Sequence, residues 1–202
     1  MHLIENEDEI YDKLQAQCLK MFEADEKLTV IDMAITLMDN EEVPMHYPFH
    51  HFIVPAVLLT ATKKAQQAAR DELCISLTEA LKRSKYVLGG FCGSHGACGA
   101  AIGMGIYMSI ATDNTPMSTR TWSWVNQATG VCLQEISKIP GPRCCKRTVF
   151  IVLKTAITFV KEKLNIDLPM QEQIICKYYE RNAECKRVLC SFYQADSEGE
   201  KE

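Results

Sequence analysis

Residues 89–105 read GGFCGSHGACGAAIGMG, and they hold seven of the chain's ten glycines together with Cys92, His95 and Cys98. Glycine disfavours a regular helix, but an apolar run with helical spacing begins at Ala97 and continues for about 16 residues. The stretch therefore predicts a glycine-rich loop that turns into a buried helix, with Cys98 in the first turn of that helix.

The chain on both sides of this stretch is also predicted to be helical. Apolar side chains recur at intervals of three and four residues, and loops rich in proline, glycine or asparagine separate these runs. The pattern predicts an all-α, single-domain bundle of about seven helices over residues 1–193. Within it, 173–193 is a cysteine-rich segment, and 194–202 is predicted to be a disordered acidic tail. The expected helices span residues 5–22, 29–37, 51–64, 71–86, 97–112, 118–138 and 144–164.

The composition excludes several classes of protein. The chain has 202 residues, 47% of them hydrophobic, which is enough for one compact core. Its 22 basic and 26 acidic residues form no long block of one sign, so we expect no nucleic-acid or membrane-surface partner. Residues 1–25 are acidic where a signal peptide would be basic and apolar, and the most apolar helix is shorter than the roughly 20 residues of a membrane span. We therefore expect a cytoplasmic protein that does not enter a membrane.

Ten cysteines are many for a reducing compartment, where clustered cysteines indicate metal binding or catalysis more often than disulfides. Cys98 lies at one predicted helix start, and Cys144 and Cys145 lie at another, directly after Pro142 and Arg143. A helix N-terminus and nearby cations both favour the thiolate, which is the form that binds metal or attacks an electrophile. If these two helices run in the same direction, as an antiparallel helix between them allows, the thiolates meet at one end of the bundle.

Two histidines and a set of glycines complete this candidate site. His50 and His51 open their own helix and could join from the same end as metal ligands, whereas His46 is expected to be solvated. The small residues also leave an opening for a cofactor. The residues expected to contact a cofactor are Gly90, Gly93, Gly96, Gly99 and Arg143.

Three occupants fit such a site. An iron-sulfur cluster needs about four cysteine ligands, which Cys92, Cys98, Cys144 and Cys145 could supply. A zinc ion would use three or four of the same cysteines, with or without a histidine. A metal-free dithiol would pair Cys98 with Cys144 or Cys145. No Cys-x-x-Cys spacing is present to choose among these.

A second set of cysteines lies near the C-terminus. Cys176, Cys185 and Cys190 are three thiols within fifteen residues of polar chain, a pattern that core packing does not explain. They predict a separate metal site whose fourth ligand the sequence does not identify.

The stretches GGFCGSHGACGAAIG at 89–103 and GPRCCKR at 141–147 resemble an uncharacterised prokaryotic family, the domain of unknown function numbered 5714. The resemblance extends from PFHHFIVPA at 48–56 to the final cysteines. CGAAIGMG at 98–105, followed by the later Cys-Cys, is more distantly similar to the redox-active family named for its C, GCAxxG, C, C pattern. That resemblance implies a helical fold with a bound cluster or thiol redox chemistry at Cys98, Cys144 and Cys145. Here, however, the order around the cysteine is Ala-Cys-Gly, not Gly-Cys-Ala.

These observations together predict a cysteine-ligated metal protein, binding an iron-sulfur cluster or zinc, with a redox or cofactor-handling role. We expect a redox or cofactor-enzyme protein as its partner, and a homodimer as its assembly. One alternative is an enzyme with Cys98 or Cys145 as the nucleophile and His51 or His95 as the base. Another is an interaction or regulatory module stabilised by zinc at the C-terminal cysteines.

Overall fold

The computed structural model describes residues 4–194 of the chain. These residues fold into a single-domain bundle of α-helices without any β-strand, so the predicted all-α fold is confirmed. The sequence-based expectation of about seven helices omitted only α5, a single turn inside the glycine-rich loop. The helices are α1 (Glu7–Glu23), α2 (Val30–Met38), α3 (Phe49–Ala65), α4 (Arg70–Lys85), α5 (Phe91–Ser94), α6 (Gly99–Ala111), α7 (Arg120–Ser137) and α8 (Cys145–Leu164), followed by the short 3-10 helix η1 (Arg187–Leu189).

Helix α3 is the centre of the bundle and contacts α1, α2, α4, α6 and α8. Every residue from Phe52 to Thr62 is buried, because the sequence of this segment is apolar or small on all sides. Its two threonines add no unpaired polar atom. The Thr60 hydroxyl donates to the Ala56 carbonyl at 2.7 Å, and the Thr62 hydroxyl donates to the Leu58 carbonyl at the same distance.

Helices α3 and α6 pack closely because α6 presents glycines to α3. A Cβ atom at Gly103 would lie 2.7 Å from the His51 carbonyl oxygen and 2.9 Å from Pro55 Cδ. A Cβ atom at Gly99 would overlap the His51 ring itself. Any larger side chain at either position would push the two helices apart, so the predicted small-residue side of α6 serves helix packing.

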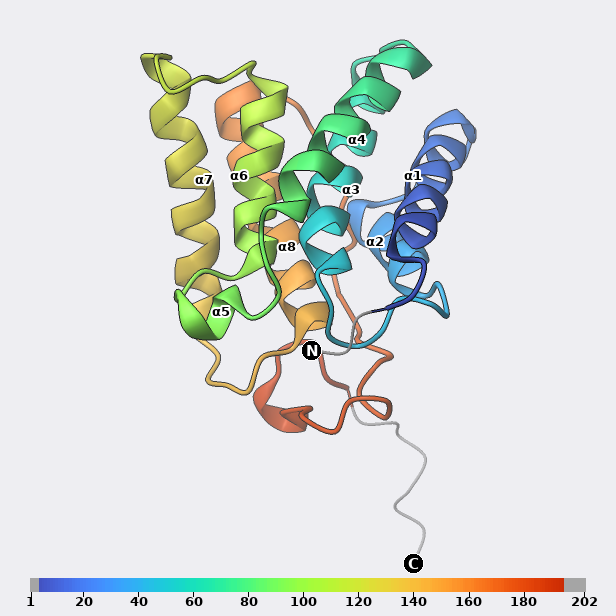
Figure 1. Cartoon of the computed structure of the whole chain (residues 1–202), viewed down its shortest axis with the longest axis vertical. Coiled ribbons are helices and arrows are strands. Elements are labelled where there is room, and N and C mark those ends of the chain that lie inside the picture. Colours follow the sequence, from blue (N-terminus) through green and yellow to red (C-terminus); the bar gives the residue numbers. More distant parts are fainter. Residues whose placement is uncertain (1–3, 195–202) are drawn as a thin grey trace, which may run out of the picture.

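Helices α3, α6 and α8 all begin at the same end of the bundle, and α7 runs antiparallel beside α6 and α8 (Figure 1). The predicted geometry is therefore correct, since the starts of the two cysteine-bearing helices, α6 and α8, lie at one end. Helix α3 begins at Phe49, with Pro48 as its N-cap, two residues earlier than the sequence predicted. His50 and His51 consequently lie within the first turn of α3, at this same end.

The chain after α8 runs back along the bundle and covers the end at which these helices begin (Figure 1). Between Asn165 and Gln194 its only helical element is η1. The Phe192 ring packs edge-on against Phe150 of α8 at 5.5 Å between centroids, and Tyr178 stacks on the same ring at 6.4 Å. The predicted acidic tail lies outside the described residues, apart from Gln194.

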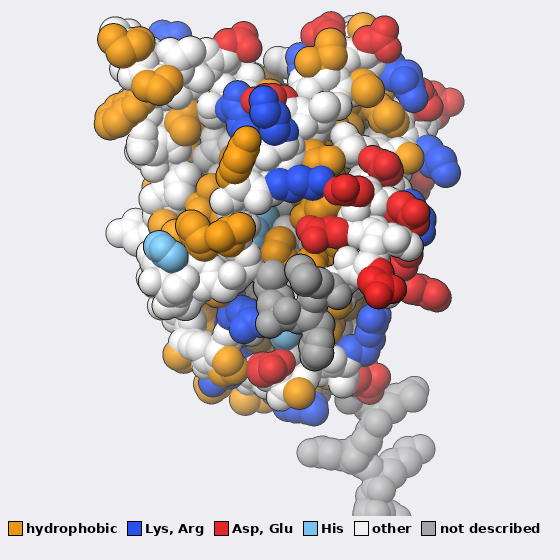
Figure 2. Space-filling view, in the orientation of Figure 1, with side chains coloured by type: hydrophobic (Ala, Val, Ile, Leu, Met, Phe, Trp, Pro, Cys, Tyr) orange, Lys and Arg blue, Asp and Glu red, His pale blue; other side chains and the backbone are white. Residues whose placement is uncertain are grey.

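Acidic and basic side chains lie next to one another on the face shown in Figure 2, so no broad patch of one sign covers it. Within residues 4–194, no helix combines the length and the apolar character that crossing a bilayer requires.

Candidate functional site: two cysteine clusters

Eight of the ten cysteines gather into two groups of four near the end of the bundle where α3, α6 and α8 begin. The remaining two lie elsewhere: Cys18 is in the core beside α3, and Cys74 is exposed on α4. We call the groups the loop cluster (Cys92, Cys98, Cys132 and Cys145) and the C-terminal cluster (Cys144, Cys176, Cys185 and Cys190).

The four cysteines of the C-terminal cluster line one cavity of about 20 Å³. A single water needs roughly 10–15 Å³ of such volume, so the cavity has room for one water molecule or one ion. Cys144 comes from the start of α8, and the other three come from the segment that folds beneath it. The structure thus gives the C-terminal set of thiols the fourth cysteine that the sequence did not identify.

Several N–H groups point at the sulfur atoms of this cluster. Cys144 Sγ accepts hydrogen bonds from the backbone N–H of Arg147 at 3.5 Å and from the Asn182 side-chain amide at 3.4 Å. Cys185 Sγ accepts one from the backbone N–H of Arg187 at 3.4 Å. N–H donors at sulfur favour the thiolate over the thiol, as metal coordination requires. The site is therefore built to accept negative charge on these sulfurs.

Burial has the opposite effect on several thiols at this end of the bundle, because it favours their neutral form. Burial is the largest cause that raises the pKa of Cys144, and it raises the pKa of Cys176 to about 11. Burial, with the neighbouring Cys98 thiol as the next cause, raises the pKa of Cys145 to about 12. Burial thus opposes the thiolate that the helix N-terminus and the nearby cations favour, and a thiolate at the start of α8 stays a prediction.

Two basic side chains directly after the cysteine pair are also buried. Arg147 is 5% exposed and lines the cavity of the C-terminal cluster, where its Nη2 donates to the Pro142 carbonyl at 3.0 Å. Lys146 is 1% exposed, and its Nζ donates to the Met38 carbonyl at 3.0 Å. Neither forms an ion pair with any acidic side chain in the part of the chain that the structure describes.

The loop cluster joins four helices. Cys145 is the first residue of α8, and its thiol lies near those of Cys92 in α5 and Cys98, the N-cap of α6. Cys132 of α7 is completely buried and lies near Cys98. The sequence assigned Cys132 to the core because it stands at an apolar position of its helix. No local pattern marked it as a neighbour of the loop.

The cysteine pair thus separates the two clusters. Cys144 is the N-cap of α8 and has an extended backbone, whereas Cys145 is the first helical residue, so the two side chains face different neighbours. The structure brings Cys92, Cys98 and Cys145 together, but it places Cys144 with Cys176, Cys185 and Cys190. The expected four-cysteine set of Cys92, Cys98, Cys144 and Cys145 is therefore not assembled at one point.

The histidines hold defined positions near this end of the bundle. His51 Nδ1 donates to the Val87 carbonyl at 3.0 Å, and His50 Nδ1 donates to the Tyr47 carbonyl at 2.8 Å. Both rings, when neutral, therefore carry an unprotonated Nε2, and that of His50 is buried with no hydrogen-bond partner among residues 4–194. Neither histidine lines the cavity of the C-terminal cluster.

The other two histidines near these clusters have polar partners. His46, expected to be solvated, instead binds the C-terminal segment through Asn182 Oδ1 at 3.3 Å and Glu184 at 3.1 Å. His95 stacks on Phe91 and bonds Ser94 Oγ at 2.8 Å. Sequence reasoning missed the contribution of Asn182, which contacts both Cys144 and His46.

The five residues expected to contact a cofactor shape the loop instead of lining the C-terminal cavity. Gly90 and Gly96 adopt positive φ angles of 91° and 64°, which glycine tolerates best. Gly93 lies in α5, Gly99 makes room for the His51 ring, and Arg143 is exposed. A cofactor role for these residues stays a prediction.

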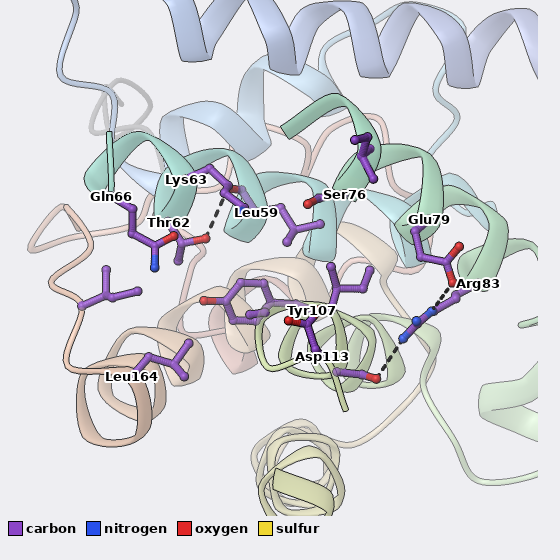
Figure 3. A pocket seen from close by; sticks show the side chains of 15 residues that line it. Leu59, Thr62, Lys63, Gln66, Ser76, Glu79, Arg83, Tyr107, Asp113 and Leu164 are labelled. Atoms are coloured by element: carbon purple, nitrogen blue, oxygen red, sulfur yellow. Dashed lines mark hydrogen bonds and ion pairs between the residues drawn. The ribbon is translucent and has the colours of Figure 1, made fainter. Parts of the chain in front are cut away.

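Another cavity, of about 400 Å³, lies between α3, α4 and α6 near the opposite end of the bundle (Figure 3). None of the residues that the sequence predicted as metal ligands, cofactor contacts or catalytic groups lines this cavity. Tyr107 forms part of its wall, and its buried hydroxyl lies beside Thr62 without a well-formed hydrogen bond to any described residue. The chemistry-bearing cysteines and this cavity therefore belong to different ends of the molecule.

Among residues 4–194, no group of three or more His, Cys, Asp or Glu side chains is arranged to hold a metal ion as it stands. The sulfur atoms of either cluster would have to move to bind one. A change of rotamer moves a cysteine sulfur by about 3 Å.

Fold and site together define an all-helical, single-domain protein with two groups of four cysteines at one end of its bundle. Residues 17–193 match the family described as "Family of unknown function (DUF5714)", and the chain belongs to this family. The match confirms the resemblance seen in the sequence and begins earlier than the segment at 48–56. No curated protein and no solved structure matches the chain. The more distant likeness to the C, GCAxxG, C, C family is not shown by this match.

Proposed function

We propose that this protein binds one metal ion, zinc, through the four cysteines of the C-terminal cluster. The observation that carries the proposal is the cavity of about 20 Å³ that Cys144, Cys176, Cys185 and Cys190 share. Four cysteine ligands without an open position are typical of a structural zinc site. An iron-sulfur cluster contains several iron and sulfide atoms, so a cavity that admits one atom favours zinc.

A metal ion at this site would have a structural role. Three of the ligands lie in a segment with little regular structure, and the fourth begins α8. A bound ion would fasten this segment to the end of the bundle, next to the glycine-rich loop. Metal binding of this kind contributes directly to the free energy of folding.

Elemental analysis of the purified protein, together with its absorption spectrum, tests the proposal. We expect about one zinc per chain and no visible absorption, whereas an iron-sulfur cluster would be coloured. Cys185→Ser should lose the zinc, and Cys74→Ser is the matched control because Cys74 is exposed and belongs to neither cluster. A wild-type protein that is folded, colourless and free of metal would contradict the proposal.

The loop cluster favours a second candidate function, a redox or cofactor-handling role with a protein partner in the cytoplasm. Cys92 and Cys98 are half-buried thiols on the glycine-rich loop, which leaves them accessible to a small reagent. Iodoacetamide should label them in the zinc-loaded protein while Cys176 and Cys190 stay protected. Equal labelling of both clusters in that protein would argue against separate roles.

A further inference from the structure

The buried cations beside the C-terminal cluster form no close ion pair with an acidic side chain of the described residues. Arg147 is 5% exposed and lines the cavity, and its Nη2 donates to the uncharged Pro142 carbonyl. An arginine side chain stays protonated in proteins, so this charge is permanent. Burying a charge without a partner is unfavourable, and buried charges are normally paired or lie beside a metal site.

A second buried cation lies on the next residue. Lys146 is 1% exposed, and its Nζ stands over the Tyr178 ring, 5.0 Å from the ring centroid. The acidic side chain in this region is Asp39, but it already accepts from Lys177 and from the Tyr178 hydroxyl. The start of α8 therefore carries two buried basic side chains within three residues of Cys144.

Four neutral thiols do not balance these charges, whereas a filled metal site does. Four thiolates around one divalent ion form a dianion. We infer that the filled C-terminal cluster is this dianion, and that Arg147 and Lys146 are its counter-charges. The inference rests on the proposed function and adds that Arg147 is a positioning residue that selects a divalent ion bound by four thiolates.

This role predicts opposite effects of one substitution on two measurements. Arg147→Met removes a buried, unpaired charge from the metal-free protein, so its urea midpoint should stay the same or rise. The same change removes a counter-charge from the filled site, so zinc affinity should fall by about 10–100-fold, the range typical of groups next to metal ligands. A residue with only a structural role would lower both quantities together.

Zinc affinity is measured by competition with a chelator, and stability by urea unfolding of the reduced, metal-free protein. Arg147→Lys keeps the positive charge and should retain most of the affinity. Lys154→Met is the control, since Lys154 is an exposed cation on the same helix. Should Arg147→Met not fold, Lys146→Met offers the same comparison with the second cation.

The outcomes separate the inference from the proposed function. Unchanged zinc affinity in both Arg147→Met and Lys146→Met would overturn the inference and leave the zinc site standing. Equal losses in Arg147→Met and Arg147→Lys would also overturn it, because shape and not charge would then matter. A wild-type protein that binds no zinc would instead remove the proposed function, and the inference with it.

Discussion

At the scale of single residues, two buried tyrosines differ in the partners of their hydroxyl groups. The Tyr178 hydroxyl donates to Asp39 Oδ1 at 2.9 Å, whereas the buried Tyr107 hydroxyl lies beside the Thr62 side chain but has no well-formed hydrogen bond within residues 4–194. Tyr178→Phe should therefore lower the free energy of unfolding by about 1–2 kcal/mol. Tyr107→Phe keeps the ring and removes an unsatisfied polar atom, so stability should stay the same or rise by up to about 1 kcal/mol. Urea unfolding of both variants checks this, and a clear loss for Tyr107→Phe would mean that its hydroxyl has a partner.

Two buried histidines make stability depend on pH. Burial is the main cause that lowers the pKa of both His50 and His51, and the Lys146 charge lowers that of His50 further. In the unfolded chain a histidine titrates near about 6.5, so below this pH the unfolded state takes up protons that the folded state excludes. The two histidines therefore do not lower the free energy of unfolding above about pH 6.5. Below this pH the free energy of unfolding falls by up to about 1.4 kcal/mol per pH unit for each histidine.

Urea unfolding of the metal-free protein at about pH 7.5 and about pH 5.5 measures this dependence without a contribution from metal release. His50→Gln removes one of the two groups that take up a proton on unfolding, so the free energy of unfolding should fall less steeply with decreasing pH, by about one proton per molecule. The same slope in wild type and in His50→Gln would show that His50 is not held neutral by burial.

At the scale of helices, the glycines of α6 fix its distance from α3. A Cβ atom at Gly103 would meet the backbone of His51 at 2.7 Å, and backbone cannot move aside as a flexible side chain can. Gly103→Ala should thus lower the free energy of unfolding by about 1–3 kcal/mol. Gly130→Ala is the matched control, because Gly130 lies in α7 with nothing within 4 Å of its added Cβ atom. This control should raise stability by about 0.5–1 kcal/mol, since alanine favours helix, and thermal unfolding compares the two.

Helices were predictable from this sequence, but the neighbours of their cysteines were only partly so. Apolar spacing located the long helices, because most of them bury one stripe of side chains and α3 is a continuous apolar run. Parallel α6 and α8 followed from the single antiparallel helix between them. The direction in which Cys144 faces depends on the exact first residue of α8, and helix ends are the least certain part of such predictions. For that reason the sequence grouped Cys144 with the loop cysteines and left Cys176 and its neighbours one ligand short.

Cys132 shows a second limit of the sequence. An apolar position on α7 is equally compatible with a core cysteine and with a member of a cluster. The packing of α7 against α6 distinguishes these two possibilities, because it places Cys132 near Cys98. Contacts between helices that are distant in sequence carry no local pattern, so this neighbour could not have been predicted.

At the scale of the whole molecule, the two parts of the C-terminal segment (residues 165–194) are attached to the bundle differently. Its first part is fastened to the start of α2: the Val30 N–H donates to the Pro169 carbonyl at 3.1 Å, and the Thr29 hydroxyl contacts the Gln171 side chain at 3.0 Å. Its later part has few regular hydrogen bonds, and it carries three of the four cysteines around the small cavity. The two parts should therefore respond differently when a metal ion is removed.

Hydrogen exchange measured with and without a chelator tests this difference. The amides of Cys176, Cys185 and Cys190 donate to backbone carbonyls at 2.7–3.0 Å, so they report directly on the order of the later part. Chelation should speed their exchange by about tenfold or more, while the amides of α3 and α6 keep their protection, since the helical core does not depend on the ion. Added zinc should restore slow exchange in wild type but not in Cys190→Ser. A uniform rise across all helices would instead mean that the ion stabilises the whole bundle, and no change in the later part would mean that packing of Tyr178 and Phe192 alone holds the segment in place.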